Sequence, residues 1–158
     1  MLKGEKTLEK RPSLDNYFME LAHTVAKRST CLRHNMGAVL VKEKHILSTG
    51  YNGAPKGLAH CRTIDCVRAK QNIPSGQRHE LCRGAHAEAN AIIQAAYHGT
   101  STANSIMYST HQPCALCAKL IINAGIREVV YTSSYNDALS RDLLKSAGVK
   151  LRHVLTEQ

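Results

Sequence analysis

The spacing of apolar residues predicts a helix near the start of the chain. After Ser13, which is a suitable N-cap, apolar side chains recur at intervals of four, three and four residues. These side chains are Leu14, Phe18, Leu21 and Val25. The spacing places them on one helix face, so we expect a helix from Ser13 to about Ser29. Residues 1–11 are charged and show no period, so we expect them to be flexible.

Further along the chain, strand and helix patterns alternate. Apolar runs at 37–41 and 46–50 flank a charged turn at 42–44 and predict a β-hairpin. The later pattern predicts helices at 85–97, 114–124 and 137–147, and strands at 106–110, 128–132 and 149–155. This alternation predicts a layered α/β sheet in which crossover connections make the later strands parallel.

Residues 51–84 interrupt the regular pattern. The segment is rich in Gly, Pro, Cys and charged residues and has no sustained period. Long irregular segments in compact domains are usually functional or disordered, and the cysteines and histidines here favour a segment held by metal. We expect a single domain over residues 1–158, because a chain of this length can bury a core without disulfides.

Composition indicates a cytoplasmic protein. No apolar run approaches the roughly 20 residues that span a bilayer, and the first residues lack the apolar region of a secretory signal. In a reducing compartment, the six cysteines suit metal ligation better than disulfides. The net charge of +9 suits a nucleotide phosphate, a nucleic-acid backbone or simply a solvated basic surface.

The most informative residues are three candidate zinc ligands and one carboxylate. His86 falls in the first turn of one predicted helix and Cys114 in that of another, with Cys117 on the same face. The positive end of a helix dipole favours the thiolate that zinc binds. Three protein ligands leave one position for water, which defines a catalytic rather than a structural zinc site. Glu88 points to another side of its helix than His86 and stays free to carry protons.

This arrangement predicts the hydrolysis of an amine. Glu88 takes a proton from water at the open position and passes it to the ring nitrogen beside the amine-bearing carbon, while the water oxygen bonds to that carbon. Glu88 then delivers a second proton to the departing ammonia. The alternatives are a closed zinc knuckle that includes His86, Cys114 and Cys117, and a redox dithiol.

The chain resembles the cytidine deaminase-like superfamily, and within it the deoxycytidylate (dCMP) deaminases, over about residues 14–155. His-x-Glu at 86–88 and Pro-Cys-x-x-Cys at 113–117 form the known signature of zinc-dependent nucleobase deaminases. Residues 50–57, Gly-Tyr-Asn-Gly-Ala-Pro-Lys-Gly, are similar to the Gly-Tyr-Asn-Gly-x-Pro-x-Gly segment of dCMP deaminases. In tRNA adenosine deaminases a tryptophan usually precedes this asparagine, and the present chain has no tryptophan.

The resemblance implies a three-layer α/β/α fold with a mixed five-stranded sheet, a Zn²⁺ cofactor, and conversion of dCMP to dUMP for thymidylate synthesis. It implies that Asn52 binds the sugar, the Ala87 N–H binds the base carbonyl, the Thr110 region accepts from the leaving amine, and Tyr135 borders the nucleotide. It also implies a homo-oligomer, a hexamer or a dimer, and regulation by dCTP and dTTP with Mg²⁺.

The remaining four cysteines predict a second, structural zinc. They are Cys31, Cys61, Cys66 and Cys82. A closed zinc would hold the irregular segment, which has too few apolar residues to fold on itself. Some dCMP deaminases carry a second zinc at positions matching Cys31 and Cys61. His79 and His60 are rival ligands for Cys66 or Cys82, and a further alternative is that some of these cysteines are small buried apolar groups.

A monophosphate also needs a cation at the mouth of the pocket. The candidates, on segments leading to the zinc motifs, are Arg33, Lys56, Arg62, Arg78 and Arg83. Two other functions stay open: deamination of another substrate such as cytidine, guanine or tRNA adenosine, and a non-enzymatic zinc-stabilised nucleic-acid binder that only the net charge favours. We expect neither a membrane nor a nucleic acid as a partner.

Overall fold

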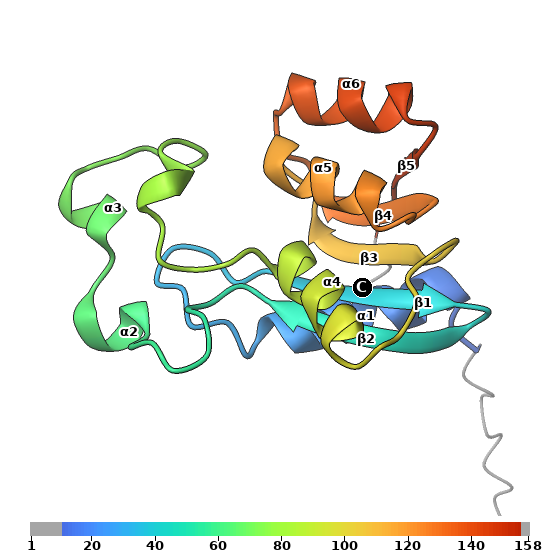
Figure 1. The fold of residues 1–158 in the computed structure, drawn as a ribbon, viewed down its shortest axis with the longest axis horizontal. Helices are drawn as coiled ribbons and strands as arrows, with labels where there is room; N and C mark the ends of the chain where they lie inside the picture. Colours follow the sequence, from blue (N-terminus) through green and yellow to red (C-terminus); the bar gives the residue numbers. More distant parts are fainter. Residues whose placement is uncertain (1–10, 156–158) are drawn as a thin grey trace, which may run out of the picture.

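In the computed structural model, which describes residues 11–155, five strands form one mixed sheet (Figure 1). They are β1 (Gly37–Lys42), β2 (His45–Tyr51), β3 (Ile106–His111), β4 (Glu128–Ser133) and β5 (Lys150–His153). Their order in the sheet is β2-β1-β3-β4-β5. β1 runs antiparallel to β2 and β3, whereas β3, β4 and β5 are mutually parallel. The predicted mixed sheet with parallel later strands is confirmed.

The β1–β2 hairpin is tighter than the sequence pattern predicts. Lys42 pairs with His45, so the turn has two residues instead of the three expected at 42–44. Glu43 and Lys44 both have positive φ angles, 51° and 66°, as the favoured two-residue hairpin turn requires. The charged residues of the expected turn therefore belong partly to the strands.

One face of the sheet is covered by α1 (Leu14–Ala26). The Ser13 hydroxyl accepts a hydrogen bond from the Asn16 N–H at 3.1 Å, which confirms Ser13 as the N-cap. Buried side chains of α1 pack in one cluster with alternate residues of the strands. The cluster contains Phe18, Met19, Ala22, Val39, Val41, Tyr108 and Val130.

The predicted end of α1 at about Ser29 is wrong by three residues. The N–H groups of Lys27, Arg28 and Ser29 each bond the carbonyl three residues earlier, which tightens the chain beyond an α-helical turn. The Ser29 hydroxyl then donates to the Asn52 carbonyl at 3.0 Å, and this contact directs the chain toward the end of β2.

The opposite face carries α4 (Ala87–Tyr97), α5 (Ala115–Asn123) and α6 (Ala138–Ser146). Ala38 and Leu40, which alternate with the β1 residues facing α1, pack into the core beneath these helices. The three-layer α/β/α architecture is therefore confirmed. Each helix starts one or two residues later than predicted, so His86 and Cys114 occupy N-cap positions.

The last strand is shorter than the predicted 149–155. Gly148 takes a positive φ of 74°, and the Val149 N–H donates to the Leu144 carbonyl at 2.9 Å. Val149 therefore closes the C-terminus of α6, and β5 begins only at Lys150.

The segment predicted as irregular, 51–84, contains three short helical turns. They are α2 (Cys61–Ile64), α3 (Val67–Lys70) and the 3₁₀ turn η1 (His79–Leu81). Elements of four residues or fewer are too short to produce a hydrophobic period, so sequence patterns do not reveal them. In Figure 1 the part with α2 and α3 lies beside the sheet rather than over it.

Two expectations concern the ends of the chain and the membrane. The predicted flexible segment 1–11 lies outside the described residues except for Arg11, which has no regular structure. Within residues 11–155, no helix is both long and apolar enough to cross a bilayer.

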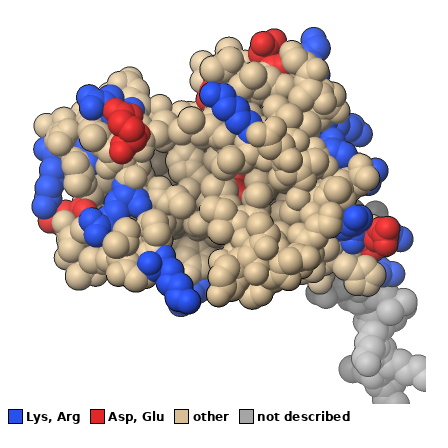
Figure 2. Space-filling model, viewed as in Figure 1, with Lys and Arg blue, Asp and Glu red and all other residues tan. Residues whose placement is uncertain are grey.

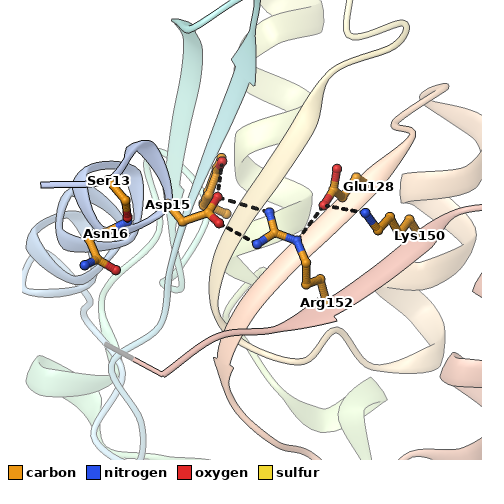
Figure 3. A network of polar contacts seen from close by, with 7 residues as sticks. Ser13, Asp15, Asn16, Glu128, Lys150 and Arg152 are labelled. Carbon is orange, nitrogen blue, oxygen red and sulfur yellow. Dashed lines mark hydrogen bonds and ion pairs between the residues drawn. The ribbon is translucent and has the colours of Figure 1, made fainter. Parts of the chain in front are cut away.

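A polar network joins α1 to β4 and β5, the last two strands at one edge of the sheet (Figure 3). Arg152 on β5 contacts Asp15 on α1 through both terminal nitrogens, and its Nε donates to Glu128 on β4 at 2.8 Å. The Tyr108 hydroxyl donates to the same Asp15 carboxylate at 2.9 Å. The Arg152 hydrogen bond, supported by the bond from Tyr108, lowers the pKa of Asp15.

Because the pKa of Asp15 is lower in the folded state, its contribution to stability is present at neutral pH and is lost as pH falls through the folded pKa. We expect Asp15→Asn to lower the free energy of unfolding by about 1 kcal/mol at pH 7, a modest value because the pair is one third exposed. The difference in the free energy of unfolding between Asp15→Asn and the unmutated protein should become smaller below about pH 4. Urea denaturation across pH measures this, with the exposed Asp142→Asn as control; a pH-independent difference would contradict the assignment.

Candidate metal centre and substrate cavity

Three metal-binding side chains meet where α4 and α5 begin. His86 is the N-cap of α4, Cys114 is the N-cap of α5, and Cys117 lies in the first turn of α5. His86 Nδ1 lies 3.4 Å from the Sγ atom of each cysteine. Among the residues that the structure describes, this is the one group of three or more His, Cys, Asp or Glu side chains whose donor atoms all lie within 4.8 Å of one another.

Asp137 holds the turn that carries the two cysteines. Its Oδ2 accepts from the Ala115 N–H in the first turn of α5, and its Oδ1 accepts from the Ser140 N–H as the N-cap of α6, both at 2.9 Å. The Ser140 hydroxyl donates to the Pro113 carbonyl at 2.6 Å. One carboxylate thus joins the starts of two helices. The sequence analysis missed this role, because the contact with Ala115 joins residues that are 22 positions apart.

Gly50 of β2 allows α4 to approach the sheet closely. A Cβ atom at this position would lie 2.2 Å from the Ala87 carbonyl oxygen and 2.3 Å from the Ala91 nitrogen. The Ser48 hydroxyl donates to the Ala91 carbonyl at 2.7 Å, and Asn90 Nδ2 donates to the Tyr51 carbonyl at 2.7 Å. These contacts hold the first turns of α4 on β2 and so position His86.

The three donors fit a zinc ion. With Zn–N near 2.0 Å and Zn–S near 2.3 Å, neighbouring ligands of a tetrahedral site lie about 3.5 Å apart. The nitrogen–sulfur distances of 3.4 Å match this spacing. Within residues 11–155 no fourth His, Cys, Asp or Glu donor completes the cluster, so these residues would hold the metal as an open site rather than a closed knuckle.

The electrostatics of the cluster favour thiolate. The hydrogen bond with Cys117 lowers the pKa of Cys114 to about 4, and the contact with His86 acts in the same direction. The same pairing, together with burial, raises the pKa of Cys117. The contact with Cys114 raises the pKa of His86, while burial and the charge of Arg68 oppose that increase. A bound cation would compete with the protons that remain on Cys117 and His86.

Glu88 lies beside the cluster and outside its donor set. The side chain is 4% exposed, and Cys117 Sγ donates to its Oε2 at 3.7 Å. Burial raises the pKa of Glu88. A buried carboxyl group with a raised pKa holds a proton more readily than an exposed one, which suits a group that carries protons in general acid–base catalysis.

A cavity of about 370 Å³ opens beside these residues. One wall comes from the ends of the sheet and the N-termini of α4 and α5, and includes His86, Glu88 and Tyr135. The other wall comes from the segment that contains α2, α3 and η1. Figure 2 shows the hollow between these two parts of the molecule. The volume lies within the range of small-molecule sites.

Two of the four predicted substrate contacts line this cavity, Asn52 and Tyr135. Asn52 is 8% exposed; its Oδ1 accepts from the Met36 N–H and its Nδ2 donates to the His34 carbonyl, both at 2.9 Å. These bonds hold the loop before β1 and leave one amide N–H of Asn52 for a ligand. Tyr135 packs so closely on Gly76 that a Cβ there would lie 2.3 Å from its hydroxyl oxygen.

Ala87 and Thr110 do not line the cavity. Ala87 is fully buried as the first residue of α4, where the helix itself leaves the N–H without an acceptor. Thr110 Oγ1 accepts from the Gly37 N–H at 3.2 Å, and the Thr110 carbonyl accepts from the Thr132 hydroxyl at 2.9 Å. The residue after Thr110, His111, does line the cavity.

The four remaining cysteines all line the same cavity. Burial raises the pKa of Cys61, and the other three thiols act in the same direction because their ionised forms repel its own. Their sulfurs do not form a group with all atoms within 4.8 Å. Of the rival ligands, the His79 ring lies 5.1 Å from the His86 ring, and His60 is the N-cap of α2.

Two of the five candidate phosphate-binding cations, Arg33 and Arg83, line the cavity. The three that do not are Lys56, Arg62 and Arg78. Arg78 is instead ion-paired with Glu80 on the surface.

Sequence reasoning missed two buried residues in this cavity, Arg68 and Gln112. Each retains a side-chain N–H group with no hydrogen-bond partner, Nε of Arg68 and Nε2 of Gln112. Arg68 belongs to the segment without a helical period, so no pattern indicated which of its side chains turn inward. Gln112 stands directly before Pro113, and only this proximity to the motif could have drawn attention to it.

The fold is an α/β/α domain, and its His-Cys-Cys donor set suits a metal ion with three protein ligands. Residues 12–133 match the family described as the cytidine and deoxycytidylate deaminase zinc-binding region, and the chain belongs to this family. Zinc is thus the metal that both the family and the His-Cys-Cys cluster indicate.

Individual relatives agree with this assignment. The chain is 41% identical over 146 residues to a deoxycytidylate deaminase of Schizosaccharomyces pombe, covering 92% of this chain and 45% of that protein. It is 40% identical over 126 residues to the deoxycytidylate deaminase of Mycobacterium phage D29, covering 77% of this chain and 95% of the phage protein. The chain thus spans less than half the length of the S. pombe relative.

A solved structure is also similar. The dCMP deaminase of cyanophage S-TIM5, crystallised in complex with dCMP and dUMP, superposes with a TM-score of 0.77 at 29% identity. The match covers 92% of this chain and 99% of the phage chain.

The contact between Gly50 and α4 gives a test of how the centre is positioned. Gly50→Ala places a methyl group against the backbone of α4, so we expect a loss of about 2 kcal/mol in the free energy of unfolding and weaker zinc retention. Gly84→Ala is the matched control, because its Cβ would meet its nearest atom at an ordinary 3.5 Å. Chemical denaturation and zinc analysis measure both effects. Equal stability of the two variants would show that α4 does not depend on this contact.

Proposed function

We propose that this protein hydrolyses dCMP to dUMP and ammonia with zinc as its cofactor, supplying dUMP for thymidylate synthesis. The observation that carries the proposal is Glu88, a buried carboxyl group beside a three-donor cluster in a cavity of nucleotide size. The choice of dCMP is supported by relatives named deoxycytidylate deaminase and by the similar phage structure that binds dCMP and dUMP.

His86, Cys114 and Cys117 hold the zinc in this proposal. When bound there, zinc supplies a Lewis acid that makes water nucleophilic near neutral pH. Glu88 removes a proton from the attacking water and places it on the ring nitrogen beside the amine-bearing carbon. The water oxygen bonds to that carbon, the C–N bond breaks, and Glu88 passes the second proton to the leaving ammonia. Burial suits Glu88 to this role because it raises the pKa toward neutrality.

Two of the four proposed substrate contacts are supported by the cavity, and the other two come from the family resemblance. Asn52 offers its remaining amide N–H to the sugar, and Tyr135 packs against the nucleotide. The free N–H of Ala87, at the start of α4, binds the carbonyl of the base. The chain around Thr110 accepts from the leaving amine, with His111 as the neighbour that reaches the cavity.

A second, structural zinc is held by Cys31, Cys61, Cys66 and Cys82 in this proposal. All four cysteines line one cavity, on segments with little apolar core of their own, which supports this proposal. The other three thiols also raise the pKa of Cys61, so the four groups lie close enough to interact. Metal binding would draw the sulfurs together and fix the segment that forms one cavity wall.

The proposed protein is a single-domain, cytoplasmic homo-oligomer, a hexamer or a dimer. Free cysteines throughout the described residues suit a reducing compartment. Exposed apolar side chains on the adjacent helices α4 and α5 suit burial against another copy. They are Ile93, Tyr97, Leu116 and Leu120. Regulation by dCTP and dTTP with Mg²⁺ is part of the proposal because of the family resemblance.

Replacement of the proton carrier tests the proposed reaction. Glu88→Gln should lower kcat for dCMP by at least about 10²-fold and leave the zinc content unchanged, because Glu88 is not a ligand. Ultraviolet assays with dCMP, cytidine, dCTP and tRNA on the unmutated protein identify the substrate, and exposed Glu20→Gln is the control. Retained turnover in Glu88→Gln would rule out this role, and activity on another amine but not on dCMP would replace the proposed substrate.

Metal analysis tests the second zinc. We expect two zinc ions per fully loaded chain, and one in Cys61→Ser and in Cys66→Ser, because loss of a thiolate opens a four-ligand site. His60→Ala and His79→Ala distinguish the rival ligands, since only a true ligand lowers the count when replaced. One zinc in the fully loaded, unmutated protein would eliminate the second site.

A further inference from the structure

Arg68 is a buried cation without a counter-charge. The side chain is 7% exposed, and Nη2 donates to the Pro74 carbonyl at 3.3 Å, which fixes the orientation of the guanidinium. Its Nε is buried and has no hydrogen-bond partner. No ion pair within residues 11–155 includes Arg68. Burying an unpaired charge is unfavourable, so the protein maintains this arrangement at a cost in stability that a bound anion would offset.

Arg68 faces the cavity that contains the candidate catalytic residues. It lines the cavity together with His86, Glu88 and Tyr135. Its charge acts on both flanking groups: it opposes the rise in the pKa of His86 caused by Cys114, and it opposes the rise in the pKa of Tyr135 caused by burial. A ligand that reaches the metal-binding cluster therefore lies within the field of this guanidinium.

The acidic residues of the α2–α3 wall do not neutralise Arg68. Asp65 pairs with Lys70 at 3.1 Å, and Glu80 pairs with Arg78. Glu88, the remaining acid of the cavity, is buried with a raised pKa and belongs to the proton-transfer machinery. Figure 2 shows Lys and Arg on the outer surface of the part that carries α2 and α3, together with a cluster of Asp and Glu. Arg68 therefore presents to a ligand in the cavity a positive charge that has no acidic partner among the described residues.

We propose that Arg68 binds the phosphate group of a nucleoside monophosphate and thereby makes the site select nucleotides over nucleosides. The proposal rests on the proposed deaminase function and adds to it the residue that binds the phosphate. A planar guanidinium with a free Nε–H suits a phosphate oxygen, and its burial strengthens the contact. Arg33 also lines the cavity and has a buried Nη1 without a hydrogen-bond partner, but its side chain is only partly buried, so Arg68 is the more deeply buried of the two cations.

A structural alternative is that Arg68 balances the charge of the four cysteines. Cys66 is the N-cap of the helix that carries Arg68, and a zinc ion held by four thiolates has a net negative charge. The two roles differ in what they affect. A phosphate ligand changes the discrimination between nucleotide and nucleoside, whereas a charge-balancing cation changes metal content and stability for every substrate equally.

The test compares Arg68→Gln, Arg68→Lys and Lys145→Gln in the zinc-loaded full chain. We expect Arg68→Gln to lower kcat/KM for dCMP by about 100-fold, mainly through KM, and to change kcat/KM for deoxycytidine by no more than about threefold. Arg68→Lys should recover part of the loss, since it keeps the charge but not the planar fork. Lys145→Gln removes an exposed charge on α6, outside the cavity and without an ion pair among the described residues, and should behave like the unmutated protein.

Direct binding separates this proposal from the reaction. Calorimetry with dUMP and deoxyuridine needs no turnover; the unmutated protein should prefer dUMP, and Arg68→Gln should lose that preference. Equal losses for the phosphorylated and unphosphorylated ligands, or a lower zinc count in Arg68→Gln, would overturn the phosphate role. If the unmutated protein deaminates none of the substrates yet binds dUMP through Arg68, the proposed reaction fails and the phosphate site stands.

Discussion

Two helix N-termini must meet over one face of the sheet for this centre to exist. α4 reaches that point because Gly50 lets its first turn touch β2, and α5 reaches it because Asp137 ties its start to that of α6. His86 Nδ1 then lies 3.4 Å from the Sγ atom of each cysteine. The antiparallel hairpin and the parallel β3–β4 pair are therefore both needed to assemble one set of ligands. The hairpin is the surface on which α4 packs, and α5 is the connection between β3 and β4.

The same arrangement sets the electrostatics of the site. The helix N-termini and the close pairing of sulfurs stabilise a thiolate, while burial raises the pKa of the neighbouring Glu88. An ionised thiol and a carboxyl group with a raised pKa thus lie side by side. Across the cavity, the segment with α2 and α3 brings a buried guanidinium. A ligand between these walls meets proton-transfer chemistry on one side and positive charge on the other.

Long periodic elements and the motif residues could be predicted from the sequence, because each signal lies within a few residues. Ser13, the hairpin and the helices after His86 and Cys114 are examples. The rest depends on contacts between distant residues. Arg68 lies in a helix too short to show a period, Asp137 acts on Ala115 across 22 positions, and the ends of α1 and β5 depend on Asn52 and Leu144.

An open catalytic centre requires a zinc ion with three protein ligands and a carboxyl group that does not bind the metal. Anomalous diffraction at the zinc edge from crystals of the loaded protein tests this most directly. We expect a zinc ion within bonding distance of His86, Cys114 and Cys117. Solvent or a ligand should fill the fourth position, and Glu88 should lie beside that position without a bond to the metal. A fourth protein ligand in that position, or Glu88 itself coordinated, would contradict an open catalytic centre.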